Sequence, residues 1–376
     1  MKKLITGIAL GMLMLTLPSH AAATGPTVEV TFVLDTTQSM RELIEGAKQK
    51  IWTIVRHMNS GRPTPTIRLG LIGYRDRGDE YVTVPYDLTD DIDLVYGHLI
   101  EFKALGGGDM PESVNQALYE AVTKVSWDKN PKTLKIIFLV GDAPPHMDYP
   151  DEMKYPEITQ LAARSGIIIN TIQCGWHTVT TPIWKEIAAK AGGAYAQINQ
   201  SGGMTKFVTP VDAELTRLSR ELAGTAVPYG SAAKQSEVRS KMAAAGRADV
   251  DRIAFLNLEQ AAFGEKAVVT GSGELIWDVV NQKVKLEDIP DSDLPLTLQG
   301  KTVEQRKTFV ADQVSRRKDL QIRVDELSKQ RDAHVKAEMT KLAESGIRDS
   351  FDKAIAEMIH IEAKRLGIDY DISAHQ

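Results

Sequence analysis

The chain has 376 residues, of which 43% are hydrophobic and 25% are charged, a composition that excludes a disordered or fibrous protein. Its 50 acidic residues outnumber its 45 basic ones, so the binding of a polyanion, which needs clustered Lys and Arg, is not expected as the main function. The only cysteine is Cys174, which excludes an intrachain disulfide framework, a cysteine-based zinc site and a CxxC redox pair.

Residues 1–23 have the order of a secretory signal peptide. Lys2 and Lys3 precede an apolar run that ends at Leu17, and small residues follow at 21–23. The alternative is a membrane anchor, but the run is shorter than the ~20 residues that a spanning helix needs. We therefore expect an exported protein of the periplasm, with full secretion as the alternative.

Residues 26–208 alternate short apolar runs with amphipathic stretches, which predicts an α/β domain with a doubly wound, mostly parallel sheet. The first and fourth runs lack alternation, as is typical of strands buried on both faces. A short run after a turn predicts an edge strand that pairs with the second strand. The predicted strands are 28–34, 67–72, 81–84, 135–140, 166–172 and 194–198, and the predicted helices are 40–58, 92–102, 113–125, 156–163 and 182–191.

The rest of the chain has a different composition. Residues 209–300 are rich in Ala, Glu, Lys and Arg, which predicts a mainly helical middle region. Residues 301–376 are richer in charge, and their apolar stripe predicts a charged amphipathic helical hairpin that packs on its own chain. The alternative is a coiled coil that assembles copies of the chain into an oligomer.

Oxygen-bearing side chains gather at the predicted ends of strands. In a doubly wound sheet, ligands bind beyond the carboxyl ends of the strands, so loops there converge on one point. Carboxylates and hydroxyls without a cysteine or a histidine pair suit a hard cation such as Mg²⁺ or Mn²⁺. The candidate ligands follow the first strand, precede the third helix and follow the fourth strand: Asp35, Thr37, Ser39, Asp109, Glu112 and Asp142.

These loops resemble the metal-ion-dependent adhesion site of the von Willebrand factor A domain. Asp35, Thr37 and Ser39 match the family's D-x-S/T-x-S loop, and Asp142 matches the acid of its third loop. The family's second loop usually supplies a threonine ligand. Here that loop instead resembles the D-x-P-E loop of β-integrin I-like domains. That resemblance implies that Glu112 reaches the adhesion-site metal and that Asp109 serves an adjacent Ca²⁺. The resemblance to the von Willebrand factor A domain as a whole covers about half of the chain.

The resemblance implies a non-enzymatic, cation-dependent protein-binding module for adhesion or scaffolding. Neutral hydroxyl ligands leave the cation electrophilic, so a carboxylate of the partner can complete its shell. The main alternative is a metal-dependent phosphohydrolase of the haloacid dehalogenase type that uses Asp35 as its nucleophile. In that class Ser39 and the D-x-P-E loop have no role. A purely structural protein with a vestigial A domain is the third interpretation, and the complete set of oxygen ligands argues against it.

Overall fold

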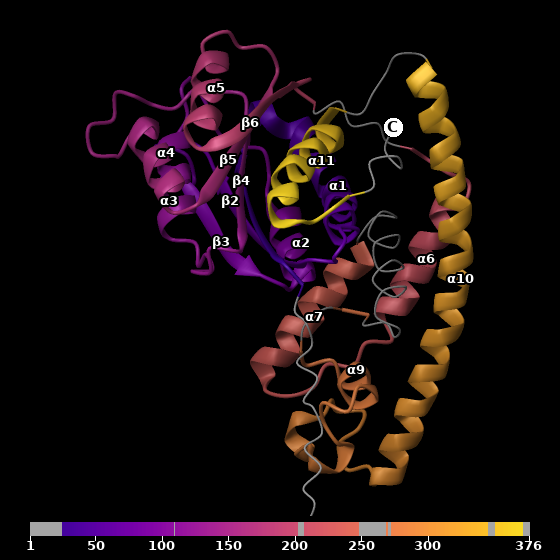
Figure 1. The fold of residues 1–376 in the computed structure, drawn as a ribbon. Coiled ribbons are helices and arrows are strands. Elements are labelled where there is room, and N and C mark those ends of the chain that lie inside the picture. Colours follow the sequence, from indigo (N-terminus) through magenta and orange to yellow (C-terminus); the bar gives the residue numbers. More distant parts are fainter. Residues whose placement is uncertain are drawn as a thin grey trace, which may run out of the picture.

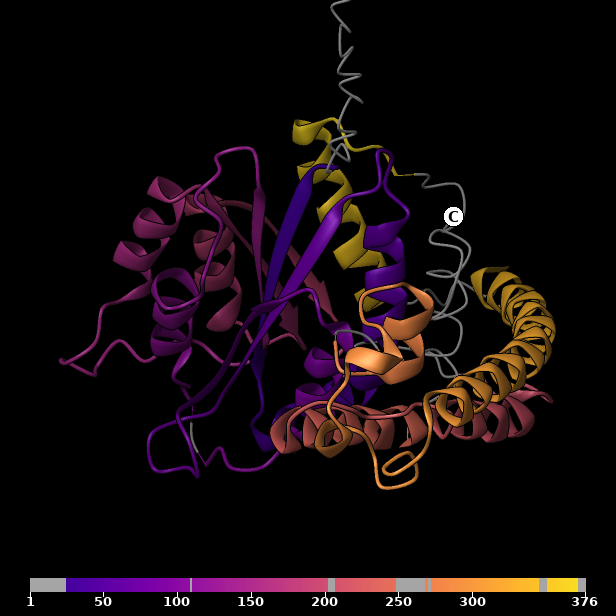
Figure 2. The ribbon, with the colours of Figure 1, turned by 90° about the horizontal axis from the view of Figure 1, so that it is seen from below.

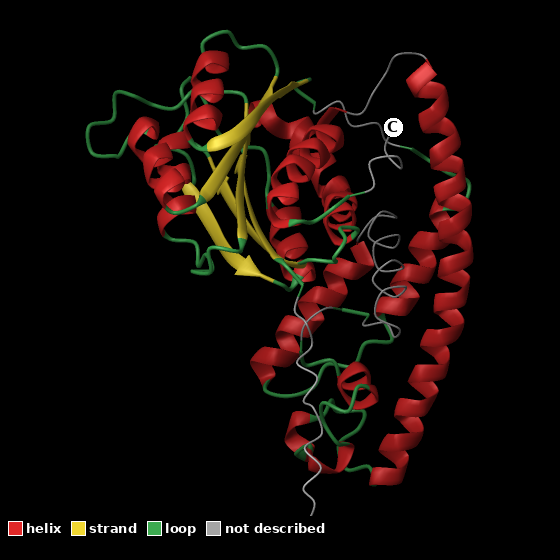
Figure 3. Ribbon diagram, viewed as in Figure 1, coloured by secondary structure: helices red, strands yellow, loops and turns green. Residues whose placement is uncertain are grey.

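The computed structural model describes residues 25–108, 110–201, 207–247, 268–269, 272–344 and 350–370. Its centre is a sheet with helices around it (Figure 3), and the six strands have the order β3-β2-β1-β4-β5-β6. All neighbouring strands are parallel except β2 and β3, so the predicted doubly wound, mostly parallel sheet is confirmed. The strands are β1 (Thr27–Asp35), β2 (Thr66–Tyr74), β3 (Thr83–Thr89), β4 (Leu134–Gly141), β5 (Ile167–Cys174) and β6 (Gly192–Ile198).

Burial explains where the strand predictions succeed. Every residue of β4 is buried, and so is every residue of β1 after Thr27, because helices cover both faces of the central strands. The edge strand was predicted at 81–84, but β3 occupies Thr83–Thr89. It contains Pro85, which an edge strand tolerates because one side of its backbone needs no hydrogen bonds to a neighbour.

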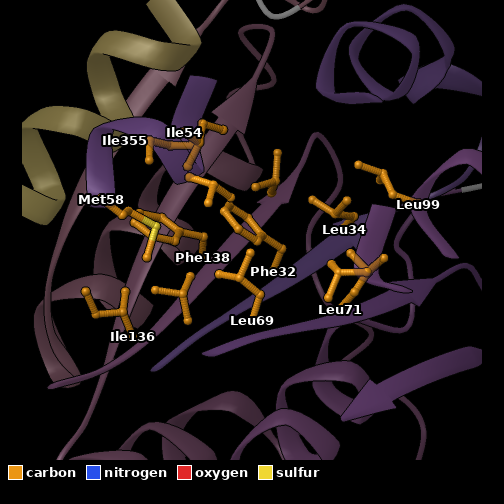
Figure 4. Close-up of a cluster of buried hydrophobic side chains, with 14 of the residues drawn as sticks. Phe32, Leu34, Ile54, Met58, Leu69, Leu71, Leu99, Ile136, Phe138 and Ile355 are labelled. Atoms are coloured by element: carbon orange, nitrogen blue, oxygen red, sulfur yellow. The ribbon is translucent and has the colours of Figure 1, made fainter. Parts of the chain in front are cut away.

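Two layers of helices cover the sheet (Figure 1). On one face, α1 and α2 share a hydrophobic cluster with Phe32 and Phe138, whose rings stack 5.4 Å apart (Figure 4). On the other face, α3, α4 and α5 pack on a second cluster that contains the fully buried Trp184. These helices are α1 (Arg41–Asn59), α2 (Ile92–Glu101), α3 (Val114–Thr123), α4 (Tyr155–Arg164) and α5 (Thr180–Lys190).

Four helices, α6, α7, α9 and α10, lie beside and below the sheet and are called the arm (Figures 1 and 2). The helix α10 has 42 residues, which makes it about 60 Å long. Leucines of α6 pack on Leu320 and Val324 of α10. Short 3-10 turns lie at Gln38–Met40, Leu286–Asp288, Asp291–Asp293 and Lys364–Leu366. The remaining helices are α6 (Asp212–Ala223), α7 (Ala232–Arg247), α9 (Leu275–Val280), α10 (Val303–Glu344) and α11 (Ser350–Ala363).

The predicted hairpin over residues 301–376 is wrong in its packing. The helix α10 lies on α6, whereas α11 leaves it and packs on α1 and β6 (Figure 1). Ile355 of α11 is buried in the cluster of Phe32 (Figure 4), and Ile359 belongs to the same cluster. After α11, Tyr370 Oη donates a hydrogen bond of 3.1 Å to the carbonyl of Met58 at the end of α1. The last described residues therefore belong to the core of the α/β domain.

The predicted signal peptide, residues 1–23, lies outside the described residues. Among the helices that the structure describes, none is both long enough and apolar enough to cross a membrane.

Candidate metal centre at the carboxyl edge of the sheet

The pairing of β1 with β4 brings two of the candidate ligands together. The strands are parallel and in register from Val28 to Leu34, with Leu34 opposite Val140. Asp35 ends β1, and Asp142 follows the last residue of β4. Asp35 is fully buried and Asp142 is half-buried. The two carboxyls therefore leave the same edge of the sheet on adjacent strands, as the sequence predicts.

The first loop links three candidate ligands into one chain of oxygens. Thr37 donates to Asp35 Oδ1 twice, from its Oγ1 at 2.6 Å and from its backbone N at 2.9 Å. Thr37 Oγ1 also lies 3.2 Å from Ser39 Oγ. Thr37 is buried and Ser39 is exposed. The oxygens thus lead from the buried end of β1 to the surface.

The second loop places Glu112 against the third loop. The backbone N of Glu112 donates to the carbonyl of Pro144 at 3.0 Å, and the N of His146 donates to the carbonyl of Glu112 at 3.2 Å. The side chain of Glu112 is buried. A Cβ atom built on Gly107 would lie 3.2 Å from Glu112 Oε1 and 3.1 Å from Thr37 Cβ, so both side chains lie beside this glycine. Glu112 therefore faces the first loop, whereas Asp109 lies outside the described residues.

Tyr74 is a residue of this site that the sequence analysis missed. It ends β2 directly opposite Asp35 and is fully buried. A Cβ built on Gly141 would lie 2.5 Å from Tyr74 Oη and 2.9 Å from Asp35 Cβ. Because Gly141 has no side chain, it leaves space between Tyr74 and Asp35. The signal in the sequence was the position of Tyr74 at the end of a strand next to β1.

A buried polar network around Asp76 connects the second loop with the third. Asp76 accepts hydrogen bonds from Ser113 Oγ at 2.8 Å and Tyr149 Oη at 3.0 Å, and its Oδ2 lies 3.2 Å from His146 Nε2. The other ring nitrogen of His146 lies 2.7 Å from Asp148 Oδ1. His146 is therefore held by side chains and by its backbone bond to Glu112.

The α/β domain matches a known protein family. The family model of the von Willebrand factor A domain matches residues 29–209. These residues form a von Willebrand factor A domain. The match begins in β1 and ends after β6, so it contains all three loops of the candidate metal centre.

The curated relatives match about a third of the chain. The von Willebrand factor A domain-containing protein 7 of Rattus norvegicus is 36% identical over 120 residues, and that of Homo sapiens is 35% identical over 120 residues. Each match covers 32% of this chain and 12% of the relative.

Solved structures with a similar domain are more distant in sequence. The VWA domain of SpRpn10 is 13% identical, covers 46% of this chain and 89% of that chain, and has a TM-score of 0.36. Proximal thread matrix protein 1 from the mussel byssus, with a zinc-occupied MIDAS motif, is 16% identical. That match covers 47% of this chain and 43% of the other, with a TM-score of 0.37.

The environment of the candidate metal centre raises the pKa of two of its carboxyls. Burial, followed by the charge of Asp142, raises the pKa of Asp35 from 3.8 to about 7. Burial and the charges of Asp35, Asp76, Asp79 and Asp142 raise the pKa of Glu112 from 4.5 to about 9. Removal from water disfavours a carboxylate, and neighbouring carboxylates disfavour it further. The metal-free site therefore retains protons that a bound cation would displace.

The side chains present fit a divalent cation. Within the described ranges, Asp35 Oδ2, Glu112 Oε2 and Tyr74 Oη are buried without a hydrogen-bond partner, which is costly unless a ligand supplies one. In the same part of the chain, no three Asp, Glu, His or Cys side chains form a group that could hold a metal ion. A cation here would thus depend on the hydroxyls of Thr37 and Ser39 as well as on carboxylates. Such an all-oxygen donor set suits Mg²⁺ or Mn²⁺.

The raised pKa values predict how stability depends on pH. Because the folded state holds these protons more tightly than the unfolded chain, the stability they contribute is full below about pH 4 and is lost as the pH rises towards about 9. Mg²⁺ should stabilise the protein more at high pH, where it competes with fewer protons. Urea unfolding from about pH 5 to about pH 9, with and without Mg²⁺, measures both trends. In the double variant Asp35→Asn, Glu112→Gln, the metal-free decline should flatten; an equally steep decline there would assign it to other groups.

The phosphohydrolase alternative receives no support from the matched family or its relatives. A nucleophilic aspartate must be accessible to its substrate. Asp35 is fully buried, and its Oδ1 accepts two hydrogen bonds from Thr37. Its environment is therefore that of a residue held in place for binding. A domain of this family is typically a non-enzymatic interaction module.

Proposed function

We propose that the A domain is a divalent-cation-dependent protein-binding module for adhesion or scaffolding and has no enzymatic activity. Mg²⁺ or Mn²⁺ would be held by the hydroxyls of Thr37 and Ser39 and by the carboxyls of Asp35, Asp142 and Glu112, of which no more than two would contact the cation directly and the third would act through a bound water. The observation that carries this proposal is that Asp35 Oδ2, Tyr74 Oη and Glu112 Oε2 are buried without a hydrogen-bond partner where the three loops meet, and that the first two face Gly141, which has no side chain to fill the space. Asp109 would serve an adjacent Ca²⁺, as in the D-x-P-E loops it resembles.

A carboxylate of the partner would complete the shell of the cation. The hydroxyls of Thr37 and Ser39 are neutral, so they leave positive charge on the metal. Ser39 is exposed and Asp142 is half-buried, so this side of the site opens to solvent. An acidic side chain entering there gains an interaction with the cation that neutral side chains cannot reproduce.

The surface around the site supports a protein partner. Large apolar side chains are exposed in the loops that carry or contact the candidate ligands, and exposed apolar side chains that gather in one region are typical of protein interaction surfaces. Two of these side chains lie in the loop that carries Glu112, one directly follows His146, and two lie in the loop after β5. At the end of that last loop, Thr180 Oγ1 donates a hydrogen bond of 3.0 Å to the carbonyl of Asp142. The exposed apolar side chains are Leu105, Met110, Met147, Trp176 and Val179.

The remaining parts of the chain suggest where the module works. The signal-peptide pattern of residues 1–23 supports export to the periplasm or beyond. The arm formed by α6, α7, α9 and α10 would act as a scaffold for the A domain. Exposed Val314 and Ile322 on α10 offer a surface for contact with a second copy.

Replacing Asp142 tests the metal site directly. In Asp142→Ala, calorimetry should detect no binding of Mg²⁺ or Mn²⁺. The circular dichroism spectrum should equal that of the parent protein, because the substitution removes a half-buried loop side chain and not a core side chain. The matched control is Asp151→Ala, an exposed acid of the same connection that pairs with Arg77. Unchanged cation binding in Asp142→Ala would contradict the assignment.

A pull-down tests the role of the cation in partner capture. The parent protein and Asp142→Ala are each incubated with periplasmic extract in Mg²⁺ or in EDTA. A partner should be retained only by the parent protein and only with Mg²⁺. Replacing the acidic residues of that partner one at a time should then identify the carboxylate that reaches the metal. Retention by Asp142→Ala in EDTA would contradict the proposed function.

A further inference from the structure

Gln200 lies over the candidate metal centre, although it belongs to none of the three loops that carry the candidate ligands. It follows β6, the edge strand next to β5. The end of β6 is tied to the loop after β5, because the backbone N of Gly175 donates to the carbonyl of Ile198 at 2.9 Å. Gln197 Nε2 donates to the carbonyl of Gly175, also at 2.9 Å. The backbone bond between Gly175 and Ile198 fixes where the chain leaves the sheet before Gln200, and the exposed amide of Gln197 only adds a side-chain contact to the same loop.

The amide of Gln200 joins the first and third loops. Its Nε2 donates to Asp142 Oδ2 at 2.6 Å and to the backbone carbonyl of Ser39 at 3.2 Å. An amide nitrogen carries two hydrogens, so each of the two oxygens can receive one, while Met40 Sδ lies 3.8 Å from the same nitrogen. The bond to Asp142 is the shorter of the two. One side chain thus connects two candidate ligand residues.

Gly175 provides the space for this amide. A Cβ built on Gly175 would lie 2.4 Å from Gln200 Oε1, which is closer than real Cβ contacts allow. Gly175 also has a φ of +73°, a backbone conformation that other residues adopt at a cost. The position of Gln200 therefore depends on a glycine in a neighbouring loop as well as on its own two acceptors.

We propose that Gln200 is a positioning residue of the metal centre. By taking one oxygen of Asp142 and bridging to Ser39, its amide fixes the direction of the Asp142 carboxyl, so that the other oxygen is left for the cation or its bound water. Carboxylates that bind metals are commonly oriented by such hydrogen bonds, and their loss typically weakens metal binding by 10- to 100-fold. This inference rests on the proposed function, because it assumes that Asp142 serves a cation.

Calorimetry with Mg²⁺ and with Mn²⁺ tests the inference. In Gln200→Ala, the dissociation constant should rise by roughly 10-fold, while the thermal midpoint of the metal-free protein stays unchanged because Gln200 is exposed. The matched control is Gln197→Ala, which also removes an amide at the end of β6 but one that binds Gly175 and not Asp142. Its dissociation constant should equal that of the parent protein.

A second variant acts on the same contact from the other side. Gly175→Ala should displace the Gln200 amide and weaken binding in the parent protein, but should add no further loss in Gln200→Ala. If the parent protein binds a cation and Gln200→Ala binds it equally well or more tightly, this inference is wrong and the proposed function stands. If the parent protein binds neither cation, both are overturned.

Discussion

Removal of α11 is expected to unfold the A domain. A chain ending at residue 344 would lose five side chains that are less than 5% exposed in the hydrophobic cluster that also contains α1: Ile355, Met358, Ile359, Ala363 and Ile368. Burying one large aliphatic side chain stabilises a protein by ~1.5–3 kcal/mol, and domains have net stabilities of only ~5–15 kcal/mol. The truncated chain should therefore show a lower urea midpoint and a loss of circular dichroism that exceeds the loss of one helix.

Point variants separate this packing effect from the effect of shortening the chain. Ile359→Ala removes a fully buried side chain and should cost ~2–5 kcal/mol of unfolding free energy. Ile361→Ala removes the same atoms from the same helix, but Ile361 is 53% exposed, so its unfolding free energy should change little. Equal effects of the two substitutions would mean that α11 does not pack on the sheet in solution.

The packing of α11 changes how partner binding must be tested. A deletion of residues 301–376 would remove part of the core beneath the sheet as well as the arm helix α10. Loss of a partner in such a deletion would therefore not show that the helices hold that partner. Substitutions at the metal centre, where Asp142 is half-buried and Ser39 is exposed, leave this core intact and answer the question directly.

Much of the sheet could be predicted because its central strands have a strong local signal. Residues 28–34 and 135–140 are short runs composed mainly of apolar and β-branched residues, with Glu29 and Lys135 as the charged exceptions, and both lie within buried strands. The positions of Asp35 and Asp142 follow from that, because a residue directly after a parallel strand must emerge at the carboxyl edge. Ser39 and Thr37 follow from their spacing in the first loop.

Other contacts depend on tertiary structure and leave little trace in the sequence. An amphipathic helix shows that it must be covered, but its pattern does not identify the surface that covers it; the sequence analysis therefore paired α11 with α10. Tyr74 and Gln200 reach the site because β2 and β6 have particular places in the strand order. The strand order is set by the whole domain, so residues brought in by neighbouring strands are the hardest to predict.

The arm contains a buried ion pair that should be its most sensitive point. Arg317 of α10 donates to both oxygens of Glu274, at 2.8 and 3.1 Å, and also to the hydroxyl and carbonyl of Thr225 at 2.9 and 2.8 Å. The Glu274 side chain is 1% exposed. It also accepts hydrogen bonds from the backbone N of Val227 and of Trp277, both at 2.7 Å. One guanidinium thus joins α10 to the end of α6 and the start of α9.

Arg317→Ala is expected to destabilise the arm by ~3–5 kcal/mol, because it leaves the buried charge of Glu274 without its cation. The control is Arg323→Ala, six residues along α10, where an exposed arginine pairs with exposed Glu214 and solvent screens the pair, so little change is expected. Urea unfolding of each variant gives the comparison. Adding Glu274→Gln to an Arg317→Met variant should recover part of the loss, since both charges are then removed. If Arg317→Ala were no more harmful than Arg323→Ala, the contact between α10 and α9 would not depend on this pair, and apolar packing of Leu320 and Val324 on α6 would hold the arm together.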